Sequence, residues 1–328
     1  MAGRAFAFAD PGIIKLATEE FVAVCADDWY QRRRKDAEGE FFRKMADQGP
    51  RKGTGGSTRQ GIYTFTADGD LLEFKNAGQD AKATREQLDR ALKKWAALPA
   101  KRREPGAVTV PDHGKLDANY SRTPPKDGLI VRVNSRILDK QGDDYIRGTC
   151  EFTGGMKAAR DFLWLTADDV KALNALPKKV DDVSSLPDAI VRRMARFHMV
   201  DNTRGEPNFW KSAELKTNPV SVSVSKSDAD GVEYQVAGIV ILGTKKGDRG
   251  YEARLNGVIR IKDGKVTRFD LAAVGDHWGD DSGTQSGCRP GRTPFGVAFG
   301  LADATKPAER VSPQAARDLG LYLGQRED

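Results

Sequence analysis

The feature that most constrains this fold is a strict alternation of apolar and polar side chains in the second half of the chain. A period of two residues is that of a β-strand with one buried face. The strand-like segments lie at 220–224, 232–242, 251–261 and 266–274. Asp263-Gly264, between the last two segments, is typical of a tight hairpin turn. The sequence therefore predicts several long antiparallel strands, which could form a strongly bent sheet or a partial barrel.

Two strand-like and two helical segments precede this region. Strands are expected at 128–138 and 162–165, and helices at 166–176 and 188–199. Thr166 is a good N-terminal cap, since Asp168 and Asp169 follow it in the first helical turn. Helices grouped ahead of antiparallel strands indicate the α+β class. We expect residues 105–328 to form one α+β domain rich in antiparallel sheet.

The first hundred residues have a different order of elements. The sequence predicts a strand, a helix, a hairpin around Asp68-Gly69 and a second helix, at 21–25, 29–45, 62–74 and 84–98. The segment 101–106 is charged and then broken by Pro105 and Gly106, as a domain boundary often is. We therefore expect a first domain at 1–104, in a two-domain protein of α+β or α/β class.

Residues 15–99 resemble the thioredoxin-like superfamily, with its βαββα order and the residues Ala26-Asp27-Asp28-Trp29 ahead of the redox motif position. Tyr30 and Arg33 occupy the positions of the two redox cysteines, and Tyr63 that of the cis-proline. The resemblance implies a thioredoxin-like fold without dithiol activity, because that chemistry needs an attacking thiolate and a resolving thiol. Cys25, inside the predicted strand, is expected to be a buried structural residue.

Charge and cysteine content exclude several classes of protein. The chain has 53 basic and 47 acidic residues, a net charge of +6 with no separate basic domain, so nucleic-acid binding is not expected. No apolar run is long enough to span a membrane, and no export signal is evident. Cys25, Cys150 and Cys288 are too few for a disulfide framework. We therefore expect a cytoplasmic protein with no bound cofactor or metal and no membrane partner.

Two polar loops are the candidate binding sites, because loops that follow regular elements often carry function. They span 201–210 and 275–294 and are expected to face each other at one end of the sheet, with two tryptophans as the floor and His277 and Arg289 as the rim. The candidate residues are Arg204, Trp210, Asp276, His277, Trp278, Cys288, Arg289 and Arg292. The alternative is that the loops are unrelated and both tryptophans belong to the core.

The chemistry of the 275–294 loop stays open at the level of sequence. Asp276, His277, Asp280 and Asp281 could hold a divalent ion, but they lack the spacing of any known metal motif. Cys288 paired with His277 would be a nucleophile, and Arg289 with Arg292 could clamp an anion. His198 is expected to be a structural histidine at a helix end.

Three classes of function follow. The first is a redox-inactive binding or structural module that acts on an unidentified protein or small-molecule ligand. The second is an enzyme, hydrolytic or metal-assisted, with its site in the 275–294 loop. The third is a redox sensor with a single thiol. The missing cysteine pair favours the first class over any dithiol oxidoreductase.

Overall fold

The computed structural model describes residues 7–53, 57–76, 80–109, 112–148, 158–203, 205–216, 219–279 and 291–328. The chain forms two compact units, residues 3–122 and 123–328. The boundary lies later than predicted, because the segment after residue 104 is held by the first unit. The backbone N–H of Lys35 donates to Asp117, and the backbone N–H of Asp117 donates to Asp36, over 2.9 and 2.8 Å. No helix in the described ranges is long and apolar enough to cross a membrane.

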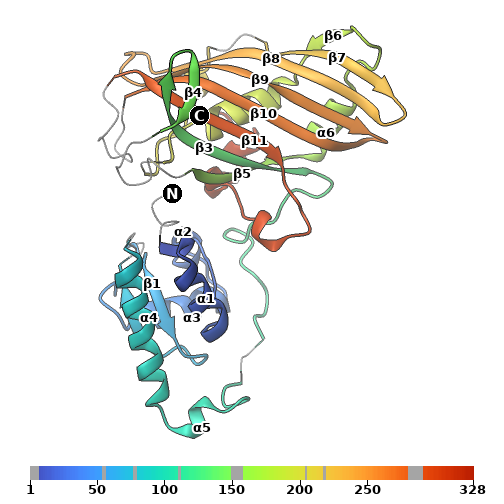
Figure 1. Ribbon diagram of the computed structural model, residues 1–328. Coiled ribbons are helices and arrows are strands. Elements are labelled where there is room, and N and C mark those ends of the chain that lie inside the picture. Colours follow the sequence, from blue (N-terminus) through green and yellow to red (C-terminus); the bar gives the residue numbers. More distant parts are fainter. Residues whose placement is uncertain are drawn as a thin grey trace. The chain divides into compact units, whose positions relative to one another are not determined.

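The first unit is mainly helical, with one two-stranded antiparallel sheet in its described part (Figure 1). Its elements are the 3₁₀ helix Ala7–Ala9, α1 Pro11–Glu20, α2 Asp28–Gln31, α3 Ala37–Ala46, β1 Ile62–Phe65, β2 Leu71–Lys75, α4 Ala81–Ala96 and α5 Ala100–Arg103. The hairpin and α4 agree with the sequence prediction. Gly69, with φ of 90°, supplies the left-handed residue of the hairpin turn.

The strand predicted at 21–25 is wrong. These residues follow α1 without strand conformation, and Val22 and Val24 are 94% and 77% exposed. An apolar run becomes a strand only beside a partner strand, and β1 and β2 pair with each other. Cys25 is exposed, so the prediction that it is buried is wrong too. The structure does not confirm the thioredoxin-like arrangement, whose central strand would lie here.

The single helix predicted at 29–45 is two helices, α2 and α3. The break at residues 32–36 contains a buried ion pair, in which Arg34 donates to both carboxylate oxygens of Asp36 over 2.7 and 2.6 Å. Asp36 also caps α3 by accepting from the backbone N–H of Gly39. A Cβ on Gly39 would lie 2.4 Å from the carbonyl oxygen of Arg34, so this turn requires glycine. The hydrogen bonds from Arg34 hold the pKa of Asp36 well below its usual range.

The second unit contains a large antiparallel sheet, as predicted (Figure 1). In the described residues its strand order is β4-β3-β11-β10-β9-β8-β7-β6, with β5 also paired to β3. The strands are β3 Leu129–Gln141, β4 Asp144–Arg147, β5 Ala159–Leu165, β6 Val183–Ser185, β7 Ser221–Asp228, β8 Gly231–Gly243, β9 Gly250–Lys262, β10 Lys265–Trp278 and β11 Thr293–Leu301. The helices are α6 Ala167–Asn174, α7 Asp188–His198 and α8 Leu319–Tyr322, with short 3₁₀ helices at Ser212–Glu214, Pro307–Glu309 and Gln314–Asp318.

The two faces of this sheet differ in what covers them. On the inward face, residues such as Val133, Leu255, Phe269 and Val297 form one apolar cluster with side chains of α6 and α7, including Met194. On the opposite, outward face, many alternate residues of the same strands are polar or charged, such as Arg132, Asn134, Arg260 and Asp270, while Ile130 is buried against the C-terminal segment. The alternation found in the sequence therefore distinguishes an apolar, helix-covered face from a more polar one.

The end of the chain packs against β5 through a buried polar network. The hydroxyl of Tyr322 accepts from the backbone N–H of Trp164 over 2.9 Å and lies 3.0 Å from Nε2 of His198. Nδ1 of His198 lies 3.0 Å from a carboxylate oxygen of Asp161. His198 is 2% exposed, which agrees with the prediction of a structural histidine. Burial raises the pKa of Tyr322 far above its usual value.

Candidate functional site

The residues predicted in the 275–294 loop begin inside β10, where strand alternation separates them. His277 faces inward, is 2% exposed and packs against the rings of Tyr251 and Phe295, so it is not at a polar rim. Asp276 and Trp278 face the other way. The guanidinium of Arg292 lies 3.9 Å from the Trp278 ring centroid, and Arg292 pairs with Glu252. Asp276, Trp278 and Arg292 therefore share the outward face, and His277 belongs to the core.

Trp210 is a core residue rather than the floor of a pocket. It is 1% exposed and its indole N–H donates to the carbonyl of Met199. Arg249 covers it, with the guanidinium 4.1 Å from the ring centroid, and donates to the carbonyl of Asn208. Trp278 donates to the carbonyl of Gly247, in the same turn as Arg249. Asn208 and Trp278 thus both contact the turn between β8 and β9, but Trp210 is buried in the core while Trp278 is on the outward face, so the two indoles do not form one floor.

Several predicted residues lie outside the described part of the chain. They are Cys150, Arg204, Asp280, Asp281, Cys288 and Arg289. Within the described ranges, no group of three or more His, Cys, Asp or Glu side chains is arranged to hold a metal ion. The proposed pairing of Cys288 with His277 and the anion clamp of Arg289 with Arg292 stay predictions.

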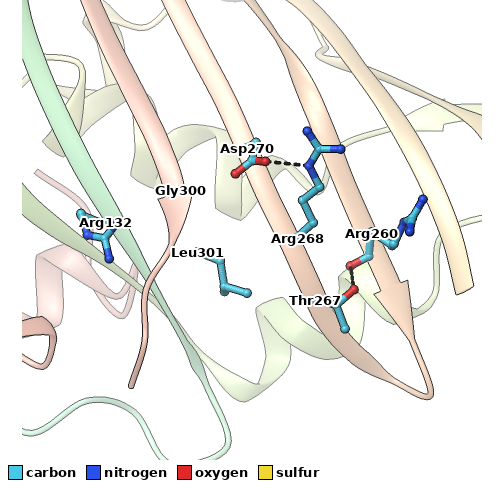
Figure 2. A pocket seen from close by; sticks show the side chains of 7 residues that line it. All are labelled: Arg132, Arg260, Thr267, Arg268, Asp270, Gly300 and Leu301. Atoms are coloured by element: carbon cyan, nitrogen blue, oxygen red, sulfur yellow. Dashed lines mark hydrogen bonds and ion pairs between the residues drawn. The ribbon is translucent and has the colours of Figure 1, made fainter. Parts of the chain in front are cut away.

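A depression lies on the outward face of the sheet in the second unit, at residues that the sequence did not predict as a site (Figure 2). Its volume is about 580 Å³. Residues of β3, β9, β10 and β11 line it: Arg132, Arg260, Thr267, Arg268, Asp270, Gly300 and Leu301. Three of these seven residues are arginines, and only one is acidic, so donors for an anion dominate the lining.

Two of the arginines are direct neighbours across the β9–β10 ladder. Arg260 pairs in register with Arg268, an arrangement of like charges that weakens a sheet unless something compensates for it. Glu233, on β8, provides part of that compensation, because it accepts from Nη2 of Arg260 over 2.8 Å and lies 3.9 Å from Arg268. Asp270 accepts from Nε of Arg268 over 2.6 Å (Figure 2). Its hydrogen bond raises the pKa of Arg268.

Arg132 approaches from the other wall, on β3 (Figure 2). Its Nη2 donates to Glu309, and this hydrogen bond lowers the pKa of the Glu309 carboxyl. Gly300 lies between the walls, and a Cβ added to it would meet nothing within 4 Å. The base of the depression at Gly300 therefore carries no side chain. A larger residue at this position would fill part of the depression.

The arrangement is suited to binding an oxyanion. Each guanidinium has five N–H donors in a planar fork, and the carboxylates of Glu233, Asp270 and Glu309 engage only some of them. These carboxylates orient the arginines before any ligand arrives, which reduces the entropy lost on binding. Carboxylates and phosphates match the guanidinium fork in geometry.

No protein-family model, no curated protein and no solved structure matches the chain.

Proposed function

We propose that the second unit binds an anionic ligand in the depression on the outward face of its sheet. The observation that carries this proposal is that Arg132, Arg260 and Arg268, from three strands, line one depression whose base at Gly300 bears no side chain. A sheet that needed only stability would place opposite charges, rather than Arg260 and Arg268, directly across a ladder. The ligand class is a small carboxylate or phosphate.

The proposal agrees with the binding-module class of function and requires no reaction. The described side chains around the depression include neither a histidine nor a cysteine, the usual general base and nucleophile of hydrolytic sites. Thr267 adds one hydroxyl at the edge. The site's donors are therefore better suited to holding an anion than to transforming it.

The experiment is calorimetric titration of the protein with galacturonate and, separately, with inorganic phosphate. Arg268→Gln should weaken the binding of either anion about tenfold or more, because one charge-assisted hydrogen bond contributes about 1.5–3 kcal/mol. Arg192→Gln is the matched control. Arg192 is an exposed arginine on α7 that pairs with a carboxylate, Asp188, and it does not line the depression. Equal affinities of the wild type and the two variants would refute the proposal.

For the first unit we propose a redox-inactive binding or structural role, with the thioredoxin-like resemblance as a prediction that needs its own test. Tyr30 is buried, and Arg33 lies 4.5 Å from the ring centroid of Trp29, so the two cysteine positions hold packing residues. The purified protein should not accelerate the reduction of insulin disulfides by dithiothreitol. Turnover well above the uncatalysed rate would contradict this role.

A further inference from the structure

A second row of arginines crosses the outward face beside the depression. The register places four residues in one line across β3, β11, β10 and β9: Arg136, Gly296, Val274 and Arg254. Three strand spacings separate the two arginines, about 14 Å between their Cα atoms. Arg254 is exposed, while Arg136 is half-buried. Two cations therefore flank a floor of small and apolar side chains.

The two arginine rows are separated along the strands. Arg132 and Arg136 are four residues apart on β3, about 13 Å, and Arg254 and Arg260 are six residues apart on β9, about 20 Å. Burial and the neighbouring Arg147 lower the pKa of Arg136. Arg147 therefore adds a third cation close to the second row.

Uncharged amides and small residues lie between the rows. The register places Asn134, Ala298, Ala272 and Asn256 in one line across β3, β11, β10 and β9. Each amide can donate and accept hydrogen bonds, as a hydroxyl-bearing ligand requires. The side chains of Ala298 and Ala272 are short, so a ligand can lie flat across this line of residues.

We propose that the natural ligand is a linear acidic oligosaccharide of uronate units, which lies along the strands with its carboxylates on both arginine rows and its hydroxyls on Asn134 and Asn256. This inference rests on the proposed anion site and extends it. A guanidinium binds a carboxylate through two parallel hydrogen bonds, and the amides between the rows supply the mixed donors and acceptors that sugar hydroxyls need.

Other polyanions fit this surface less well. Single-stranded nucleic acid is generally held by aromatic side chains on which bases stack, and the residues described above for these rows include none. An inorganic polyphosphate has no hydroxyls along its chain, so it would leave the acceptor atoms of Asn134 and Asn256 unused. Of these three polyanions, the uronate chain is the one whose carboxylates and hydroxyls match both the arginines and the amides.

The test titrates the full-length protein with galacturonate, with oligogalacturonates of increasing length, and with polyphosphate and single-stranded DNA of matched charge. Affinity should rise with oligogalacturonate length until both rows are spanned, and should exceed that for the other two polyanions. Arg254→Gln should weaken binding of the long oligomer about tenfold and weaken galacturonate binding less, because Arg254 does not line the depression. Arg192→Gln is again the control.

The outcomes separate the two proposals. If galacturonate binds in an Arg268-dependent way but affinity does not rise with length, the oligosaccharide inference is overturned and the anion site stands. If no anion binds, the proposed function fails. If polyphosphate or DNA binds as tightly as the oligogalacturonate, the ligand is another polyanion and the inference is wrong. Asn256→Ala distinguishes further, because it should weaken oligogalacturonate binding and leave polyphosphate binding unchanged; equal losses for both would contradict the inference.

Discussion

The two units of this protein differ in how much apolar surface they bury. Each buries an ion pair, Arg34 with Asp36 in the first unit and Arg193 with Asp169 in the second, but the apolar cluster of the first unit, around Ile13 and Leu88, is small. The second buries a continuous apolar cluster that joins the long strands to α6 and α7. A small unit has less apolar surface to bury, so correctly paired charges determine more of its structure. The stabilities of the two units should therefore respond to different changes.

The largest effect is expected from a core truncation in the second unit. Phe269 is fully buried on the inward face of β10. Phe269→Ala should lower the free energy of unfolding of this unit by about 3–5 kcal/mol, because apolar contacts are lost and a cavity is left. Hydrogen exchange read by mass spectrometry measures the two units separately. Val258→Ala, on the outward face, is the control, and faster exchange throughout the first unit as well would show that the two units do not unfold independently.

A smaller effect, dependent on pH, is expected from Asp36→Asn in the first unit. At about pH 7 the variant should lose about 1.5–3 kcal/mol of unfolding free energy, because charge-assisted hydrogen bonds to Arg34 are weakened. The pKa of Asp36 is lower in the folded unit than in the unfolded chain. Its ion pair therefore stabilises the unit above about pH 4, and this stabilisation is lost as the pH falls further.

The measurement is urea unfolding at a series of pH values. The wild type should lose stability in acid more steeply than Asp36→Asn. Asp89→Asn is the control, since Asp89 forms an exposed pair with Arg85 over 3.8 Å and should change stability by less than about 1 kcal/mol. Parallel pH profiles for the wild type and Asp36→Asn would show that the buried pair does not govern the acid sensitivity.

The smallest effect is expected where the sequence prediction was wrong. Val24→Ser should change the unfolding free energy by less than about 0.5 kcal/mol, because the side chain is 77% exposed. Val224→Ser is the matched substitution in β7, at 2% exposure, and should cost at least about 1.5 kcal/mol. Thermal unfolding of both variants gives the comparison. A large loss for Val24→Ser would mean that the segment 21–25 is buried after all.

The sequence predicted the second unit better than the first because alternation carries more information than apolarity alone. The predicted segment 232–242 corresponds to β8, Gly231–Gly243, and 251–261 to β9, Gly250–Lys262. Alternation specifies both the strand and the face that is buried. The run at 21–25 shows only that a strand is sterically favourable, and no neighbouring strand in the described residues is positioned to pair with it.

The functional residues show the same limit. The burial of His277 could have been inferred from alternation on β10. His277 lies an even number of residues from Phe269, Leu271 and Ala273, which are all buried on the inward face. The outward direction of Arg260 was equally readable from alternation on β9. The presence of Arg132 in the same depression as Arg260 and Arg268 could not be predicted, because it depends on the pairing of β3 with β11 and of β11 with β10. No local pattern in the chain specifies which distant strands pair.

The pairing of β3 with β11 also constrains how the second unit folds while it is being synthesised. The hairpins from β7 to β10 join residues close in sequence, so they can form soon after they leave the ribosome. β3 is synthesised long before β11, so the edge of β3 at Val133 stays unpaired until Phe299 has been synthesised. Until then β3 and β5 present an open edge of apolar strands. An unpaired apolar edge promotes aggregation. The nascent chain should therefore depend on chaperones most strongly after β5 and before β11 has been synthesised.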